Sequence, residues 1–295
     1  MPRYRVLHKT VHQYETQVAS SHHSAMLQPR DTPYQECVDF RLLVRPRPST
    51  IRQRVDPFGN HITQFSLQSA HARLEVLATS LVVVRPRMDP SGKSTPPWEQ
   101  VAASARIPAG PEALEAAQFA YPSTHVPVLR ELEAFARESA KPGRPWLETL
   151  ADLNGRVHRH VAFSPGETHV GTPVEQVFVR RKGVCQDLAH LMLACLRSLG
   201  LPARYMSGYI RTRPPDGKPR LVGVDASHAW VAAFCPGHGW IEFDPTNNLL
   251  PERDHITIAH GRDYSDVSPL LGVLVGGGEH TVTVGVDVHL EPDPA

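Results

Sequence analysis

The stretch RRKGVCQDLAHLMLACLRSLGLPARY, from Arg180 to Tyr205, places a cysteine between a glycine and a helical pattern. At about 100° per residue, its apolar side chains recur on one arc of a helix. Gly200 and Pro202 follow as ordinary helix stop signals. The stretch therefore predicts a helix that begins near Cys185 and buries one face. The predicted apolar arc comprises Leu188, Leu191, Met192, Cys195, Leu196 and Leu199, and the opposite side carries Gln186, His190 and Arg197.

The two cysteines of this helix have different surroundings. Cys195 lies within the apolar arc, which indicates core packing. Cys185 lies in the first turn, where unpaired N–H groups and the positive end of the helix dipole stabilise an anion. A thiolate at such a position is a nucleophile near neutral pH. The alternative is a small residue that fits a tight turn, and this segment alone leaves both interpretations open.

Two downstream segments supply partners for a thiol nucleophile. DASHAWVAAF places His228 at the start of a strand-like run, and GHGWIEFDPTNN places Asp244 at the end of the next run. The short CPGHG connection predicts that the two runs pair as a hairpin, which brings His228 near Asp244. A thiolate nucleophile needs a base, and the base needs an orienting group. The order of cysteine, histidine and acid along the chain is that of papain-like enzymes.

The rest of the chain divides into segments of different periodicity. Residues 1–84 alternate with a period of two between turns such as DPFGN, which predicts an N-terminal antiparallel β-sandwich. The Pro-rich residues 85–97 are interpreted as a linker. Residues 98–295 show helices first and strands afterwards, which predicts an α+β domain. In the strand ECVDFRLLVRP, one face is expected to carry Val38, Phe40, Leu42 and Val44.

One helix start has its own signature. In TPVEQVFVRRKG, Thr172 is followed by Pro173 and, three positions after the threonine, by Glu175. This arrangement predicts a capping box at the start of a helix that Gly183 stops.

Composition excludes several classes of protein. The net charge is +1 without a run of Lys or Arg, so neither nucleic acid nor a membrane surface is an expected partner. The N-terminal residues lack the apolar segment of a signal peptide, and no stretch reaches the length of a membrane span. Free thiols in a cytoplasmic protein are therefore expected. The four cysteines are Cys37, Cys185, Cys195 and Cys235.

The motifs GVCQDLAHL, HAW and FDPTN together resemble the bacterial transglutaminase-like superfamily of cysteine proteases and acyltransferases. GRDYSDVSPLLGVLVGGG is similar to the tail of the same family, and residues 1–84 look like its N-terminal β-domain. The resemblance implies a papain-like (transglutaminase-core) fold. It also implies Cys185 as nucleophile, His228 as general base and acid, and Asp244 as the orienting carboxylate.

The chemistry that the resemblance implies is acyl transfer or hydrolysis at an amide through a thioester. The expected partners are a protein or peptide with a glutamine side chain or a peptide bond as acyl donor, and an amine as acceptor. A cysteine peptidase using the same site, or a binding module that keeps the papain-like fold without catalysis, are the alternatives. No cofactor is expected, because no Asp-rich calcium loop is present and His158 and His160 lack a third nearby ligand.

The groups that would bind the substrate are less well defined. The backbone N–H of Cys185 is the natural first donor to an oxyanion. Family members often carry Tyr or Trp upstream of the nucleophile as a second donor, but Phe163 occupies the matching position here. Gln186 is a substitute donor or a solvated helix residue. Tyr209 and Trp230 are candidates to line the acyl cleft, although a strand aromatic is more often part of the core.

Asp187, which follows the motif, has two interpretations. It could pair with Arg180 or Arg181. The simpler expectation is a solvated carboxylate in the first turn of the helix.

Overall fold

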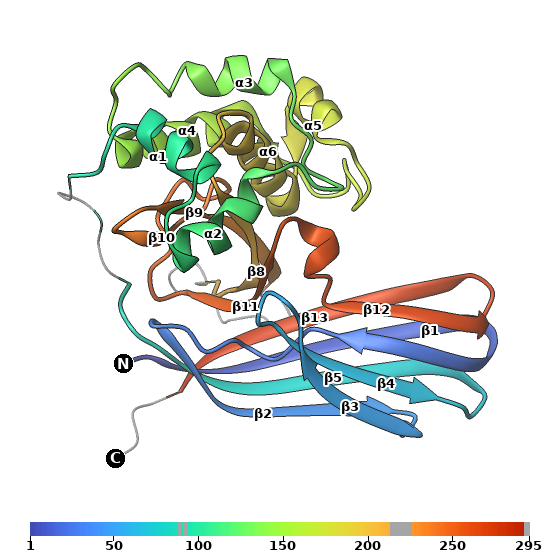
Figure 1. Cartoon of the computed structure of the whole chain (residues 1–295). Helices are drawn as coiled ribbons and strands as arrows, with labels where there is room; N and C mark the ends of the chain where they lie inside the picture. The colour runs from blue at the N-terminus through green and yellow to red at the C-terminus, as the bar shows by residue number, and fades with distance from the viewer. Residues whose placement is uncertain (88–89, 91–93, 213–225, 292–295) are drawn as a thin grey trace, which may run out of the picture.

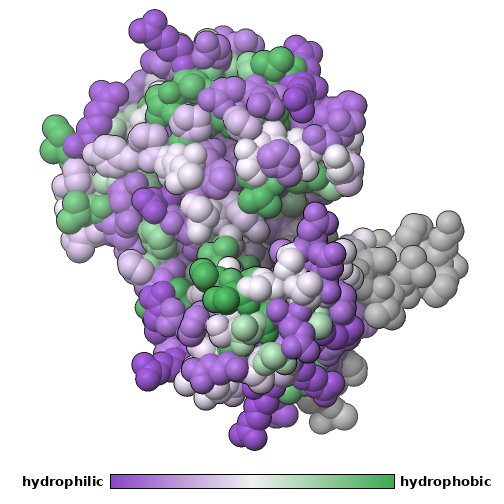
Figure 2. Space-filling view, turned by 90° about the vertical axis from the view of Figure 1, so that its right-hand side faces the viewer, coloured by the Kyte–Doolittle hydropathy of each residue, from purple (hydrophilic) through white to green (hydrophobic). Residues whose placement is uncertain are grey.

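The computed structural model describes residues 1–87, 90, 94–212 and 226–291. Strands near both ends of the chain form a large sheet, and the middle of the chain forms helices and a smaller sheet above it (Figure 1). Figure 2 shows the same two parts from the side, with the surface indented where they meet. One core cluster includes Tyr4 and Val6 from the large sheet together with Trp146 and Leu191 from the helices. The two parts are therefore joined by a continuous apolar core.

Seven antiparallel strands build the large sheet. Its order is β2-β5-β1-β4-β3, with β12 and β13 also pairing with β1. The strands are β1 (Arg3–Ala25), β2 (Gln35–Arg45), β3 (Thr50–Val55), β4 (His61–Leu67), β5 (His71–Val84), β12 (Leu270–Gly276) and β13 (His280–Glu291).

The register makes this sheet equivalent to four long strands, of which β1 is continuous and the other three are each interrupted once. The first half of β1 lies between β5 and β13, and its second half lies between β4 and β12. β2 continues alongside β5, and β3 continues alongside β4. Apolar residues from both halves, such as Phe65 and Leu74, bury against each other in a second core cluster. The expected N-terminal antiparallel β-domain is thus confirmed, as one bent sheet in place of two separate sheets.

The C-terminal strands lie in a different sheet from the one the sequence suggested. Residues 98–295 were expected to form one domain, but β12 and β13 pair with β1 along its length, from Ala25 opposite Leu270 to Arg3 opposite Glu291. Without them this side of β1 would be an open edge with unpaired backbone groups. The alternating valines of residues 280–291 predict a strand, but local sequence does not say which sheet the strand joins.

The upper part is an α+β unit, as expected for a papain-like core. Its four-stranded antiparallel sheet has the order β10-β9-β8-β11. The strands are β8 (Ala203–Ile210), β9 (Ala226–Cys235), β10 (Gly239–Phe243) and β11 (His255–Gly261), with a short parallel pair, β6 (Ala162–Phe163) and β7 (Lys182–Gly183). The helices are α1 (Trp98–Arg106), α2 (Pro111–Ala117), α3 (Arg130–Arg137), α4 (Trp146–His160), α5 (Val174–Arg180) and α6 (Cys185–Ser198), with 3-10 turns at Gln118–Ala120 and Tyr264–Asp266.

Helix α6 is the central helix of this unit. It begins at Cys185 as predicted, and Gly200 follows its end with φ +77°, a conformation that favours glycine. Cys195 is fully buried in the core. The opposite side of the helix is buried as well, which the sequence pattern did not indicate. His190 stacks on His125, and Arg197 donates hydrogen bonds to backbone carbonyls of Phe119, Ala203 and Arg262.

The predicted capping box of α5 does not form. The helix begins at Val174, and the Thr172 hydroxyl accepts a hydrogen bond from the His169 N–H instead of capping the helix. The helix ends before Gly183, because Arg181 adopts a left-handed conformation with φ 56°.

The expected linker, residues 85–97, is described only in part, since residues 88–89 and 91–93 lie outside the described ranges. Arg85 still contacts the large sheet through Glu36, whereas later residues of the segment contact the upper unit. Arg87 pairs with Glu242 at 3.1 Å, and the Thr95 hydroxyl accepts a hydrogen bond from the Leu147 N–H. Among the helices in the described ranges, none combines the length and apolar character needed to cross a bilayer.

Candidate active site

Three side chains that the sequence singled out meet between α6 and the small sheet. Cys185 is the first residue of α6, His228 lies near the start of β9, and Asp244 directly follows β10. β9 and β10 pair as the predicted antiparallel hairpin, with Phe243 opposite Val231. This pairing brings the residues at the open end of the hairpin together.

The hydrogen bond between His228 and Asp244 fixes the imidazole. His228 Nε2 lies 2.8 Å from Asp244 Oδ2, which leaves Nδ1 as the ring nitrogen available to the Cys185 thiol. The Cys185 Sγ lies 4.0 Å from the carbonyl oxygen of Ser227, the residue before His228. Cys185 is partly exposed, whereas His228 and Asp244 are buried. A reactant would therefore approach from the cysteine side.

Asp244 is held as a carboxylate by five hydrogen bonds. Its Oδ1 accepts bonds from the backbone N–H groups of Thr246 and Asn247. Its Oδ2 accepts bonds from His228 at 2.8 Å, from the Asn247 amide at 2.7 Å and from His255 at 3.0 Å. The side chain has no exposed surface, so the protein supplies every partner that water would supply outside.

The electrostatics of the group favour a charged pair. Burial by itself would lower the pKa of His228, but the hydrogen bond to Asp244 and the interaction with Cys185 outweigh it and raise the pKa to about 9. Burial would raise the pKa of Asp244, yet its hydrogen bonds from His228 and His255 hold it well below its usual range. An imidazolium between a carboxylate and a sulfur is thus the stable state of His228 at neutral pH.

The two candidates for the acyl cleft, Trp230 and Tyr209, are both buried and offer no surface to a substrate. Trp230 is fully buried and donates its indole N–H to Glu242 at 2.7 Å, so it has no surface to offer a substrate. It stacks on His228 with ring centroids 6.0 Å apart and supports that ring from inside. Tyr209 is also buried, and its hydroxyl lies 2.8 Å from Nδ1 of His8 on β1. Tyr209 therefore belongs to the contact between the two parts of the molecule.

The other residues named for the oxyanion have clear positions. The Gln186 amide donates a hydrogen bond to the carbonyl oxygen of Val170, 3.2 Å away. Phe163 lies in β6 and is 57% exposed, and its ring carries no donor. The N–H of Cys185 is among the first-turn groups that have no partner inside their own helix. The structure thus leaves the backbone of Cys185 as the best-placed donor.

Asp187 differs from both sequence interpretations, which were pairing with an arginine and solvation. It is buried and accepts hydrogen bonds from the Val184 N–H at 2.8 Å and from the Thr168 hydroxyl at 2.6 Å. It caps α6 from inside the first turn. A Cβ on Gly183 would lie 2.8 Å from the Asp187 side chain, which explains the glycine before the cysteine.

Two residues near Cys185, His228 and Asp244 were not predicted from the sequence. His255, the first residue of β11, bonds to Asp244, and nothing in the pattern DHITIAHG distinguishes it among seventeen histidines. Tyr205 is buried on β8, and burial first and then the nearby Cys185 raise the pKa of its hydroxyl well above its usual value. Finding His255 requires the register between β8 and β11, and finding Tyr205 requires the packing of β8 against α6; local sequence specifies neither.

One set of ligand atoms in the described ranges has the spacing of a metal site. The nitrogens of His228 and His255 and a carboxylate oxygen of Asp244 all lie within 4.8 Å of one another. Each of these atoms already takes part in a hydrogen bond of ordinary length, which accounts for the cluster. The other histidines considered for a metal, His158 and His160, bond to backbone carbonyls of different segments.

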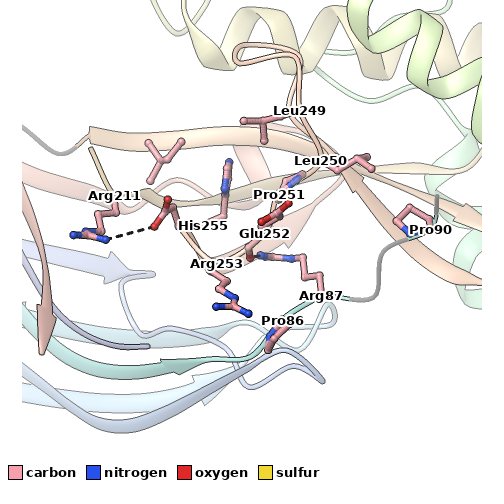
Figure 3. A pocket seen from close by; sticks show the side chains of 12 residues that line it. Pro86, Arg87, Pro90, Arg211, Leu249, Leu250, Pro251, Glu252, Arg253 and His255 are labelled. Carbon is pink, nitrogen blue, oxygen red and sulfur yellow. Dashed lines mark hydrogen bonds and ion pairs between the residues drawn. The ribbon is translucent and has the colours of Figure 1, made fainter. Parts of the chain in front are cut away.

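A cavity of about 720 Å³ reaches the group through His255. Figure 3 shows His255 among the arginines Arg87, Arg211 and Arg253, with Arg211 paired to Asp254. Neither Cys185 nor His228 lines this cavity. The cavity therefore borders the acid end of the group and not its thiol.

Comparisons with known proteins show what the chain is similar to. The family model of the bacterial transglutaminase-like N-terminal region matches residues 4–83, and that of the transglutaminase-like superfamily matches residues 133–245. The uncharacterized protein Rv2569c of Mycobacterium tuberculosis is 37% identical over 294 residues, covering 97% of this chain and 92% of that protein. A protein-glutamine gamma-glutamyltransferase of Pseudomonas aeruginosa is 40% identical over 78 residues, covering 26% of this chain and 12% of that enzyme.

A solved structure has the same architecture as the whole of this chain. It is a cysteine-protease candidate from Cytophaga hutchinsonii, with a TM-score of 0.78 and 20% sequence identity, covering 100% of this chain and 92% of the other. At this identity the likeness shows the fold, including the N-terminal β-domain in front of the papain-like core.

Proposed function

Because this chain belongs to the bacterial transglutaminase-like superfamily, we propose that it catalyses thiol-dependent acyl transfer or hydrolysis at amide bonds. Cys185 is the nucleophile, His228 the general base and acid, and Asp244 the carboxylate that orients the imidazole. The observation that carries the proposal is geometric: a partly exposed cysteine at a helix start faces an imidazole whose other nitrogen is fixed 2.8 Å from a buried carboxylate.

The proposed reaction has two halves. The sulfur of Cys185 attacks the carbonyl carbon of an amide, its proton having passed to His228, and a tetrahedral oxyanion forms beside the Cys185 N–H. The C–N bond breaks, the nitrogen leaves with the proton from His228, and a thioester remains. An amine or water then attacks the thioester, gives its proton to His228, and releases the acyl group while the sulfur regains its proton.

The acyl donor is a protein or peptide amide, and the amine acceptor is a second substrate. The segment that matches the Pseudomonas protein-glutamine gamma-glutamyltransferase favours a glutamine side chain as the donor. Cleavage of a peptide bond is the alternative outcome of the same site, and a binding module without catalysis is the alternative from another class. The cytoplasmic location expected from the sequence is part of this proposal.

The test offers the protein a glutamine-containing peptide together with a primary amine and identifies the products by mass spectrometry. Transamidation adds the amine, deamidation replaces the amide nitrogen by oxygen, and peptidase activity shortens the peptide. The Cys185→Ala variant should give none of these products, whereas Cys37→Ala, which alters a partly exposed thiol on β2, should retain full activity. Equal product formation by the native protein and Cys185→Ala would contradict the proposal, and no product from any peptide would favour the binding module.

A further inference from the structure

His255 places a second imidazole on the carboxylate of Asp244. It begins β11, opposite Ile210 of β8, and its Nε2 lies 3.0 Å from Asp244 Oδ2, the same oxygen that binds His228. The ring is 2% exposed and packs edge-to-face on Trp230, with centroids 5.2 Å apart and an interplanar angle of 80°. The carboxylate is therefore held between two buried imidazoles.

The hydrogen bonds of His255 determine which of its ring nitrogens carries the proton. An ionised carboxylate only accepts hydrogen bonds, so the Nε2 of His255 must carry the proton. The other nitrogen, Nδ1, is buried and has no partner within the described residues. Burial lowers the pKa of His255 although Asp244 opposes this effect. His255 is thus a neutral ring whose one satisfied group is the bond to Asp244.

Packing alone does not account for a histidine at this position. An apolar side chain would fill the space beside Trp230 without leaving a buried nitrogen unpaired, which is a costly arrangement. What the histidine adds is a second imidazole N–H donor to Asp244 Oδ2, beside that of His228. This donor restrains rotation of the carboxylate and stabilises its charge.

We propose that His255 is a positioning residue, which holds Asp244 ionised and in place so that Asp244 can orient His228 toward Cys185. The inference rests on the proposed function, because it assigns His255 a role in the same thiol chemistry. It extends the Cys185, His228 and Asp244 group by a fourth member that touches neither the thiol nor a substrate.

The experiment measures alkylation of Cys185 by iodoacetamide at two pH values, with mass-spectrometric quantification of the modified peptide. At pH 7 the rate depends on proton transfer to an oriented His228. At about pH 10.5 an ordinary thiol is ionised without help, so the rate reports only access to the sulfur. The ratio of the two rates separates positioning from general damage to the fold.

Three substitutions of His255 and one control are compared with the native protein. His255→Leu should lower the rate at pH 7 about tenfold, the effect of losing one charge-assisted hydrogen bond, and leave the rate at high pH within about twofold. His255→Gln, whose amide nitrogen can reach Asp244, should restore most of the ratio, whereas the shorter His255→Asn should not. His260→Leu alters an equally buried histidine of the same strand that does not contact Asp244, and should keep the native ratio.

The outcomes separate this inference from the proposed function. A native ratio as low as that of an ordinary thiol would overturn the proposed function and this inference with it. A high native ratio that His255→Leu leaves unchanged would overturn the inference alone. If His255→Leu does not fold, equal rate ratios for His255→Gln and His255→Asn would likewise overturn the inference alone. A native rate that rises in EDTA, but not in the His255 variants, would assign the cluster to a metal ion instead.

Discussion

Replacing Asp244 by asparagine should separate its charge from its shape. The amide oxygen can still accept the two backbone hydrogen bonds, but its NH₂ group would face the N–H groups of His228, His255 and Asn247. Two charge-assisted bonds of about 1.5–3 kcal/mol each are lost in a fully buried site. We therefore expect Asp244→Asn to lower the free energy of unfolding by about 3–5 kcal/mol.

The same change should disable the thiol. The pKa of His228 is raised to about 9, compared with an ordinary value of 6.5, which corresponds to about 3 kcal/mol in favour of the imidazolium. Asp244 raises this pKa more than Cys185 does, so without the carboxylate most of the preference should disappear. At 1.4 kcal/mol per factor of ten, the alkylation rate of Cys185 at pH 7 should fall about 100-fold.

The assays are urea unfolding followed by tryptophan fluorescence and alkylation kinetics by mass spectrometry. Asp263→Asn is the matched control, because Asp263 is also buried and accepts backbone hydrogen bonds from His125 and Ser265. It should lose stability without losing the reactivity of Cys185 at pH 7. A native rate of alkylation in Asp244→Asn, or a native urea midpoint, would refute the reasoning.

Three further changes test other parts of the structure. Gly208→Ala would place a Cβ 2.0 Å from the Ile256 carbonyl oxygen and 2.7 Å from Trp230, so the strands must separate. We expect the free energy of unfolding in urea to fall by about 3 kcal/mol. An unchanged urea midpoint would contradict the close packing at this glycine. Arg197→Leu removes a buried guanidinium that donates hydrogen bonds to several backbone carbonyls, and should lower the free energy of unfolding by about 3 kcal/mol. A stabilised variant would show that those carbonyls need no partner. Because the folded-state pKa of His228 is raised, its stabilising contribution is complete below about pH 6.5 and is lost as pH rises through about 9. The difference in unfolding free energy between the native protein and His228→Gln should therefore narrow across that window, and a constant difference would argue against the charged pair.

Local patterns predicted the thiol, base and acid because each lies at the end of an element with a clear signal. The apolar arc and Gly200 define α6, so the position of Cys185 at its start follows from sequence alone. The short connection between β9 and β10 leaves an antiparallel hairpin as the simplest pairing, and this pairing brings His228 to Asp244.

The features that the sequence did not predict depend on contacts between distant segments of the chain. His255 reaches Asp244 only because β11 pairs with β8, and β12 and β13 pair with β1 across nearly the full length of the chain. Helix α6 is covered on all sides, so its polar residues His190 and Arg197 are buried with partners from other segments. Neither periodicity nor spacing carries this information.

An irregularity in the pairing of β2 makes one face of this strand differ from the face predicted from sequence. Phe40, Leu42 and Val44 point inward as predicted, but Val38 is 50% exposed. The pairing of β2 with β5 shifts register between Cys37 and Asp39, and a bulge there turns Val38 outward. Alternation in the sequence cannot reveal such a bulge.

Competition among the four thiols for a limiting amount of iodoacetamide at about pH 6 tests the whole account most directly. At this pH ordinary thiols are almost entirely protonated, so only a sulfur paired with an imidazolium should react quickly. We predict that label accumulates on Cys185 well before Cys37, Cys195 or Cys235, and that His228→Ala removes this preference. Slow labelling that is uniform among the accessible cysteines, or a preference that survives His228→Ala, would contradict the central claim.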